Sequence, residues 1–287
     1  MTMQVSKLAI YPLKSARGIG LRTSPVTPEG LRGDRRMMLV DESGTFASQR
    51  SLPGLARLQA QLSEGQVTLT LNDGRSLTFH ESKAAGRRAV TVWSSTVDAA
   101  CAPDPVNRTL SDWLGQKLSL VFFDKASERV ANPEWAGPNA PLAFADGYPV
   151  LITTTGSLAA LNADMERRGE GQIGMERFRP NIVVDCEEAW AEDRWAALAI
   201  NGIRFDLVKP CARCIIITQD QESGSRDGAS PMPAMGRLRM SGDRRVPGPL
   251  FGWNAVPRGS GQISTGDRVE LLEERPEGWP IKRRGGA

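Results

Sequence analysis

Short runs in which apolar and polar residues alternate, separated by turns, dominate this chain. Residues 67–71 alternate in this way, residues 72–74 read Asn-Asp-Gly, and the alternation resumes over residues 77–79. An Asp-Gly pair between two alternating segments is typical of a β-hairpin. The pattern therefore predicts two antiparallel strands joined by a tight turn.

Two further hairpins are predicted. One joins residues 37–40 to 45–48 through a Ser-Gly turn, and the other joins 198–200 to 203–208 through Asn-Gly, which the type I′ turn favours. The second hairpin leads directly into the sequence Lys-Pro-Cys-Ala-Arg-Cys at 209–214. The next four residues, Ile-Ile-Ile-Thr at 215–218, have high β propensity, so we expect a strand there.

Helices are expected to be few. Residues 109–118 and 157–168 carry apolar side chains at helical spacing, and Ser157 is a suitable N-cap. Many short strands with scattered helices indicate a mixed, β-rich α+β fold of two packed β-barrel-like domains with a few peripheral helices. We expect the domain boundary near residue 120, although no Pro/Gly-rich linker marks it.

One long segment departs from this pattern. Residues 223–249 hold five glycines, four prolines and five arginines, which are Arg226, Arg237, Arg239, Arg244 and Arg245. Such a segment is either a binding loop or lid, rich in positive charge, or a disordered surface insertion. The tail at 276–287 is expected to be disordered and to carry no chemistry.

Composition bounds the class of protein. The 287 residues carry a net charge of only +3, which is too small to indicate nucleic acid but leaves an anionic small molecule possible. No apolar run approaches the roughly 20 residues that span a bilayer, and the N-terminus lacks the pattern of a secretory signal. Four cysteines are too few for a disulfide scaffold. We therefore expect a cytoplasmic protein without a membrane partner.

Cys211 and Cys214 are the main candidates for chemistry. Lys209 and Arg213 flank them, and neighbouring positive charge favours the reactive thiolate form of cysteine. His80 is the only histidine, which excludes most histidine-based metal sites and catalytic triads.

Three interpretations of the pair remain open on these residues alone. A zinc site would need ligands from Cys101, Cys186 or His80 at no recognisable spacing. Disulfide exchange normally uses a cysteine at a helix N-terminus, whereas a strand is expected here. The two cysteines could also be buried structural residues.

The segment 209–214 and the apolar run after it resemble the signature of the MOSC domain, a molybdenum-cofactor-binding module. This module is found in the mitochondrial amidoxime-reducing component, in related bacterial N-hydroxylamine reductases and in the cofactor sulfurase. Further segments resemble the family in the same order along the chain; they are 11–15, 33–40, 144–149, 177–184, 190–195, 250–252 and 266–269. The resemblance implies an N-terminal MOSC-associated β-barrel domain at 1–120 and a MOSC domain at 121–275.

The resemblance also implies roles for individual residues. Cys214 would be the molybdenum ligand and the catalytic residue, and Cys211 its neighbour. The molybdenum-molybdopterin cofactor would be held by Lys14, Ser15, Arg35, Asp146, Gly147, Arg179, Asn181, Ala212 and Arg213. Lysine, serine and arginine suit phosphate oxygens, and an asparagine amide suits a pterin edge. The chain departs from the family at Ala212, often serine, and at Trp253, often glutamine.

The function that the resemblance implies is reduction of N-hydroxylated compounds, namely hydroxylamines, amidoximes or N-hydroxylated bases. The sequence has no cysteine cluster suited to a [2Fe–2S] centre. The electrons would then come from a separate ferredoxin, flavodoxin or cytochrome-type protein with its reductase. The alternative is a cofactor-binding or sulfur-carrier module without its own turnover. In the cofactor sulfurase a similar domain is joined to a pyridoxal-phosphate desulfurase half, which we do not expect here, and pyridoxal phosphate binding is a further family association.

Overall fold

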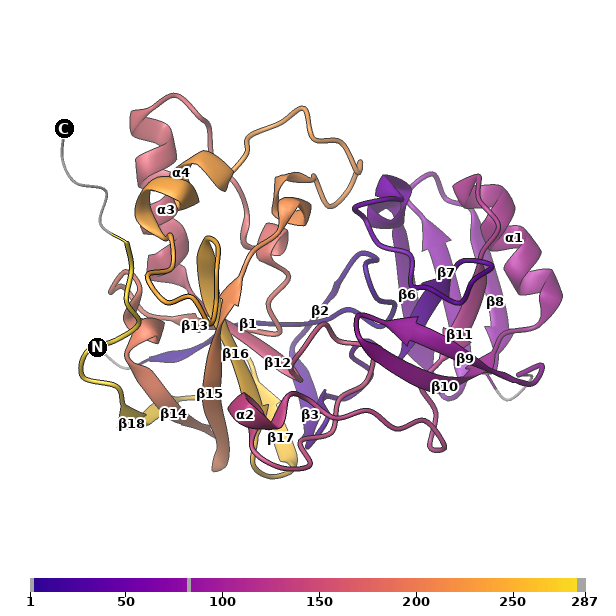
Figure 1. Cartoon of the computed structure of the whole chain (residues 1–287), viewed down its shortest axis with the longest axis horizontal. Coiled ribbons are helices and arrows are strands. Elements are labelled where there is room, and N and C mark those ends of the chain that lie inside the picture. The colour runs from indigo at the N-terminus through magenta and orange to yellow at the C-terminus, as the bar shows by residue number, and fades with distance from the viewer. Residues whose placement is uncertain (1–2, 82–83, 283–287) are drawn as a thin grey trace.

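The computed structural model describes residues 3–81 and 84–282, and it is organised by one long curled sheet (Figure 1). This sheet forms the larger of two lobes. Its eight strands are, in sheet order, β18 (Val269–Glu274), β14 (Trp195–Ile200), β15 (Ile203–Ala212), β16 (Leu250–Pro257), β12 (Val150–Thr154), β13 (Ile182–Asp185), β1 (Gln4–Ile10) and β2 (Ile19–Leu21). A three-stranded sheet of β17 (Gly261–Ser264), β3 (Thr23–Thr27) and β4 (Gly30–Leu31) belongs to the same lobe.

The smaller lobe is also built from sheets. One sheet has the order β5 (Met37–Val40), β11 (Ser119–Phe122), β10 (Ser95–Cys101) and β9 (Arg87–Val92), and the other is β6 (Leu58–Ser63), β7 (Gln66–Leu71) and β8 (Ser76–His80). The predicted β-rich α+β class, with two curled, half-barrel lobes, is confirmed.

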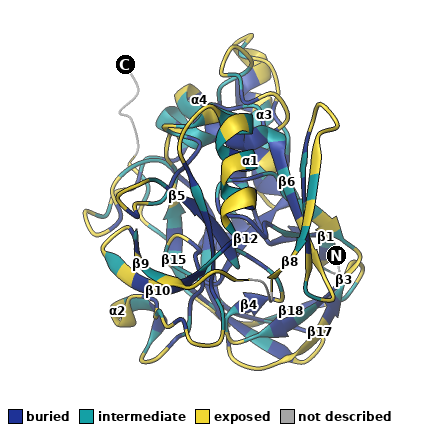
Figure 2. Cartoon of the chain, turned by 90° about the vertical axis from the view of Figure 1, so that its right-hand side faces the viewer, coloured by how far each residue is buried: buried dark blue, intermediate teal, exposed yellow. Residues whose placement is uncertain are grey.

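The helices lie at the edges of the lobes (Figure 2). They are α1 (Asp104–Leu114), α2 (Pro133–Ala136), α3 (Thr155–Arg167) and α4 (Met232–Leu238), with short 3₁₀ turns η1 (Pro53–Arg57), η3 (Met175–Phe178), η4 (Ala191–Asp193) and η5 (Ile215–Thr218). In the part of the chain that the structure describes, no helix is long and apolar enough to cross a bilayer.

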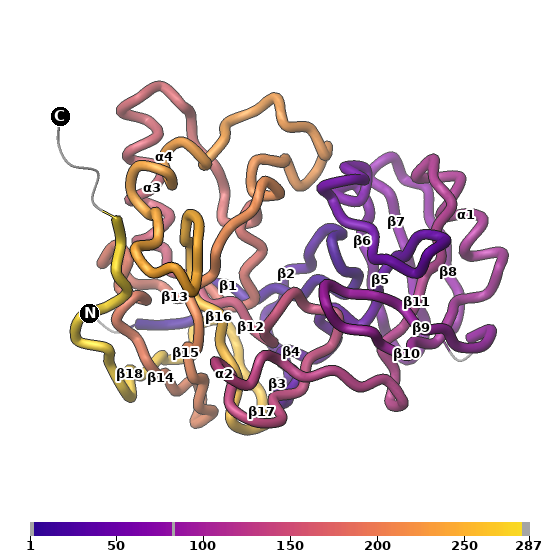
Figure 3. Tube along the Cα trace, viewed as in Figure 1, coloured from indigo at the N-terminus to yellow at the C-terminus, as the bar shows by residue number. Residues whose placement is uncertain are grey.

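The chain passes between the lobes twice, as the trace in Figure 3 shows. β1 pairs with β13, which lies some 170 residues later, so the first strand belongs to the lobe formed by the second half of the chain. The chain enters the smaller lobe at β5 and returns after β11. The division at residue 120 stays a prediction, and strand pairing crosses it.

Local patterning explains most strands. Along β7 every second residue is buried, and these side chains join Leu58 and Leu120 in the core of the smaller lobe. The predicted β7–β8 and β14–β15 hairpins are confirmed, with Leu69 opposite Leu77 and Ile200 opposite Ile203. The hairpin predicted over 37–48 is present in a short form: Val40 bridges Phe46 antiparallel, and the Ala47 amide donates to the Leu39 carbonyl at 2.8 Å, while the longer pairing of β5 is with β11.

Both predicted helices exist with different starts. The first begins at Asp104, directly after Pro103, and ends at Gly115 in the left-handed conformation. The second is capped by Thr154, whose hydroxyl accepts a hydrogen bond from the Ser157 amide at 3.2 Å. Ser157 is therefore inside the first turn, and its own hydroxyl donates to the buried Glu192 carboxylate.

The arginine-rich segment is folded rather than a disordered insertion. Arg237 donates to the carboxylates of Asp164 and Glu170, and Arg239 forms a buried ion pair with Asp193. These two arginines are therefore committed to packing the segment against α3 and η4, and they are not free to attract a ligand.

The first part of the tail is also ordered, contrary to expectation. The Gly242 amide donates to the Pro280 carbonyl at 2.7 Å, and the Trp279 ring packs against Trp253 of the core. The expected disorder thus does not extend over residues 276–282, and residues 283–287 lie outside the described residues.

Gly252 on β16 provides a test of this packing. Its φ is +73°, and a Cβ there would lie 2.6 Å from Thr153 Cγ2 and 2.7 Å from the Ile152 carbonyl oxygen. Gly202, in the exposed β14–β15 turn, has a φ of +74° and open space around it. We expect Gly252→Ala to lower the free energy of unfolding by about 3 kcal/mol and Gly202→Ala by about 1 kcal/mol. Urea unfolding measures both changes. Equal losses of unfolding free energy in the two variants would show that the β12 residues Ile152 and Thr153 do not approach Gly252 so closely.

Candidate functional site

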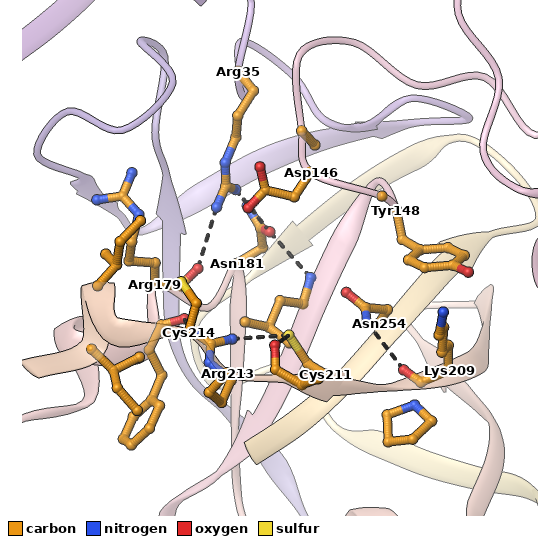
Figure 4. Close-up of a pocket in the computed structure, with 18 of the residues that line it drawn as sticks. Arg35, Asp146, Tyr148, Arg179, Asn181, Lys209, Cys211, Arg213, Cys214 and Asn254 are labelled. Carbon is orange, nitrogen blue, oxygen red and sulfur yellow. Dashed lines mark hydrogen bonds between the residues drawn. The ribbon is translucent and has the colours of Figure 1, made fainter. Parts of the chain in front are cut away.

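A cavity of about 330 Å³ opens beside the end of β15, where loops of both lobes meet (Figure 4). All ten residues that the sequence assigned to a cofactor site line it: Lys14, Ser15, Arg35, Asp146, Gly147, Arg179, Asn181, Ala212, Arg213 and Cys214. They come from five separate segments of the chain. Their roles as cofactor contacts stay predictions.

The end of β15 presents the cysteines to this cavity. The ladder between β15 and β16 shifts register at Cys211 and resumes at Ala212, opposite Leu250, and the Arg213 amide donates to the Pro249 carbonyl at 2.8 Å. The strand predicted at 215–218 is wrong, because the chain loses its pairing partner at this point and turns into η5. Cys214 therefore lies between the end of β15 at Ala212 and the start of η5 at Ile215.

The two cysteines have different surroundings. Cys214 is exposed, whereas Cys211 is half-buried and its sulfur accepts a hydrogen bond from Arg213 Nη1 at 3.0 Å. Both are free thiols. The described residues contain no group of three or more His, Cys, Asp and Glu side chains that could hold a metal ion, so no zinc cage surrounds the pair.

Lys14 lies at the floor of the cavity. It is only 4% exposed, and its ammonium group donates to the Phe144 carbonyl oxygen at 2.9 Å and to the Asp146 carboxylate. Burial lowers the pKa of Lys14 because it disfavours the charged form, although Asp146 opposes this effect. Partial desolvation raises the pKa of Asp146, whose side chain is still 71% exposed, but attraction and hydrogen bonding from Lys14 outweigh it and leave the pKa below its ordinary value. This carboxylate stays ionised.

Two arginines lie against the same tyrosine ring. The guanidinium carbons of Arg35 and Arg179 are each 4.3 Å from the centre of the Tyr11 ring. Burial raises the pKa of Tyr11 to about 12 and lowers that of Arg179 to about 10. Arg35 Nη1 donates to Asp34 at 2.5 Å and to Asn181 Oδ1 at 3.1 Å. The Tyr11 ring thus lies between the guanidinium groups of Arg35 and Arg179 at the cavity wall. Of these two arginines, Arg35 donates to a described carboxylate and Arg179 does not.

The backbone of the site is strained. Ser15, Arg35 and Arg179 have φ values of 63°, 47° and 56°, in the left-handed region that side chains other than glycine rarely adopt. Hydrogen bonds hold these residues in place, for example from Gln49 Nε2 to the Ser15 carbonyl at 2.8 Å and from Arg179 Nη1 to Gln221 Oε1 at 3.0 Å. Such strain costs of order 1–3 kcal/mol per residue and is concentrated at functional sites.

The charge balance of the cavity fits an anionic ligand that brings its own metal. Five cationic side chains, those of Lys14, Arg35, Arg179, Lys209 and Arg213, line it against the single carboxylate of Asp146. The Nε atom of Arg213 is buried and has no hydrogen-bond partner among the described residues. A single soft sulfur, that of Cys214, cannot hold a metal alone, so the remaining ligands would have to come with the bound group.

Sequence reasoning missed several residues of the site. Trp93, Tyr148 and Asn254 line the cavity, and Arg50 Nη2 lies 3.6 Å from Cys214 Sγ. A tryptophan in a two-residue hairpin turn, where glycine or asparagine is usual, is a signal that could have identified Trp93. The others carry no such signal, because their proximity arises from contacts between distant segments.

Comparison with known protein families agrees with this geometry. Residues 2–117 match the MOSC N-terminal beta barrel domain, and residues 139–270 match the MOSC domain. The second match contains the cysteine pair and Asp146, Arg179 and Asn181, whereas Lys14 and Arg35 lie in the first. The cavity is therefore built from both domains.

Relatives are similar over most of the chain. The human mitochondrial amidoxime-reducing component 1 is 28% identical, with 93% of this chain and 82% of the relative covered, and the rat component 2 is 28% identical, with 92% and 82% covered. The rice molybdenum cofactor sulfurase is 24% identical over 95% of this chain but only 35% of its own length. None of these names refers to pyridoxal phosphate. The chain belongs to the MOSC-domain proteins, with a MOSC N-terminal β-barrel domain followed by a MOSC domain.

Proposed function

We propose that this protein binds a molybdenum–molybdopterin cofactor and reduces N-hydroxylated compounds such as hydroxylamines, amidoximes and N-hydroxylated bases. The observation that carries the proposal is the exposed thiol of Cys214 at a cavity lined by five cationic side chains. The relatives named as amidoxime-reducing components support the substrate class, since they cover more than nine tenths of this chain.

Each part of the cavity has a task in this proposal. Arg179 and Arg213 present guanidinium donors to the phosphate, and Lys14 adds a buried positive charge. Asn181 and Asp146 offer hydrogen-bonding edges to the pterin, and Cys214 supplies the thiolate ligand. The remaining predicted contacts are Ser15, Arg35, Gly147 and Ala212. When bound, the cofactor supplies the two-electron chemistry that cleavage of an N–O bond requires.

The protein itself holds and orients the reactants. Hydrogen bonds and an ion pair fix the side chains of Arg35, Lys14 and Asp146 in the cavity, so we expect little reorganisation on binding. The electrons would come from a separate ferredoxin, flavodoxin or cytochrome-type donor with its reductase. A location in the cytoplasm remains part of the proposal.

A second function is favoured by one comparison. The similarity to the molybdenum cofactor sulfurase extends over 95% of this chain, which supports a cofactor-binding or sulfur-carrier role without turnover. A chemical electron donor such as reduced methyl viologen separates the two functions, because it removes the need for a protein partner. A carrier would bind the cofactor and still fail to reduce benzamidoxime.

Cys214→Ser tests the proposed ligand, with Cys211→Ser as its matched control. Changes beside a metal ligand commonly cost about 10–100-fold in affinity or activity, so loss of the ligand should cost at least about 100-fold. We expect Cys214→Ser to lose bound molybdenum and benzamidoxime reduction, and Cys211→Ser to keep most of both. Metal analysis and viologen-driven assays measure this. Equal behaviour of the two variants would remove the assignment.

Lys14→Met tests the cationic floor of the cavity. It removes the ammonium group but keeps the length of the side chain, so we expect molybdenum and pterin content per chain to fall by about tenfold, as for loss of one charge-assisted phosphate contact. The cofactor-free protein should unfold at nearly the same temperature, because relief of the buried charge offsets the lost bond to Phe144. Lys125→Met, at an exposed position, is the control. Full cofactor content in Lys14→Met would contradict the proposal that Lys14 holds the cofactor.

A further inference from the structure

Two exposed apolar side chains lie next to the candidate metal ligand. Trp93 is 44% exposed and belongs to the smaller lobe, and Ile215 is 48% exposed and directly follows Cys214 in the larger lobe. Single exposed apolar residues are common and need no explanation. These two differ because one lines the cavity that holds the thiol and the other adjoins that thiol in the chain.

Arg50 reaches the same place from the smaller lobe. Its turn is anchored by the buried side chains of Ser48 and Gln49, and the half-buried Arg50 follows them. Its guanidinium carbon lies 4.7 Å from the centre of the Trp93 ring, and its Nη2 atom is 3.6 Å from Cys214 Sγ. Arg50 forms no ion pair with any described carboxylate. A guanidinium without a carboxylate partner, lying over an indole ring, therefore adjoins the candidate reaction centre.

Tryptophan is an unusual residue for the place that Trp93 occupies. The two-residue turn between β9 and β10 requires a positive φ, and Trp93 adopts 56° where glycine or asparagine is usual. Its ring is not buried, although it contacts Phe46 at 5.1 Å. Its indole nitrogen donates to Asp146 Oδ1 at 3.1 Å, which fixes the ring at the cavity. Strain without burial points to a role in binding.

We propose that Arg50 and Trp93 select the substrate, favouring planar N-hydroxylated compounds that carry a negative charge away from the N–OH group. The proposal rests on the proposed function, because it assigns a substrate class to the same site. A substrate whose N–OH group reacts near Cys214 would lie beside Arg50 and Trp93, and the guanidinium donors of Arg50 suit a carboxylate carried elsewhere on that substrate. A cationic substrate is disfavoured by the same guanidinium.

Matched substrates isolate the two preferences. 4-Carboxybenzamidoxime and 4-(aminomethyl)benzamidoxime share the ring and the reacting group but differ in the sign of the remote charge. Benzamidoxime and cyclohexanecarboxamidoxime differ in planarity and carry no remote charge. Ratios of kcat/KM within each pair, measured on molybdenum-loaded protein with reduced methyl viologen, cancel differences in loading and in electron supply.

The expected changes in the kcat/KM ratios follow from the charge of Arg50 and the aromatic ring of Trp93. The wild type should prefer the carboxylate over the ammonium substrate by about fivefold, the scale of one exposed charge interaction. Arg50→Glu should reverse that preference, and Arg50→Lys should keep it. Trp93→Leu should reduce the preference for the aromatic over the cyclohexyl substrate by about fivefold. Leu62→Ala, an exposed apolar position in the same lobe, should change neither ratio.

Binding of inert analogues separates this inference from the proposed function. 4-Carboxybenzamide and 4-(aminomethyl)benzamide lack the N–OH group, so calorimetry measures their binding whether or not turnover occurs. If the wild type reduces no amidoxime but binds the carboxylate analogue more tightly, and Arg50→Glu reverses this order, the selectivity stands and the reductase proposal fails. If loaded Arg50→Glu and Trp93→Leu proteins keep the wild-type ratios and binding order, the selectivity proposal is overturned.

Discussion

The site depends on an excess of positive charge around one cavity. Of its five cationic side chains, Lys14 is paired with Asp146 and Arg35 with Asp34, whereas Arg179, Lys209 and Arg213 form no ion pair with any described carboxylate. Burial shifts the pKa values of Lys14 and Arg179 downward, which is the direction expected when a charged group is removed from water. Binding of an anion would offset the cost of holding these like charges together.

The two lobes are needed together to maintain this arrangement. The larger lobe provides Cys214 through β15 and the left-handed Arg179, and the smaller lobe provides Gln49, which supports the carbonyl of Ser15. Gln49 and Gln221 also exchange hydrogen bonds at 3.2 and 3.1 Å across the junction. A change in how the lobes meet would therefore move both the cationic wall and the residues near the thiol.

The sequence predicts those parts of the fold that local chemistry determines. The β7–β8 and β14–β15 hairpins follow from alternation and from Asp-Gly and Asn-Gly turns. The pairing of β1 with β13 could not be predicted, because no local signal links strands so far apart. The strand expected at 215–218 does not form, because β propensity alone cannot form a strand without a neighbouring strand to pair with. The pairing of β15 with β16 ends at Ala212, opposite Leu250, before residue 215 is reached.

The candidate site shows the same limit. A family resemblance gathered ten residues that do line one cavity, although composition and spacing alone left the cysteine pair ambiguous. Arg50 and Trp93 escaped prediction, because their importance lies in contacts between the lobes and in a strained turn. Interactions of this kind become visible only when the distant segments are placed in space.

Anomalous diffraction at the molybdenum edge tests the central claim most directly. Crystals would be grown from protein produced in a molybdenum-replete host, and the anomalous difference density would locate the metal without reference to any assumed chemistry. The account predicts a single strong peak in the cavity, at bonding distance from Cys214 Sγ. The absence of a peak in pterin-containing crystals, or a peak bonded to Cys211 or lying outside the cavity, would contradict it.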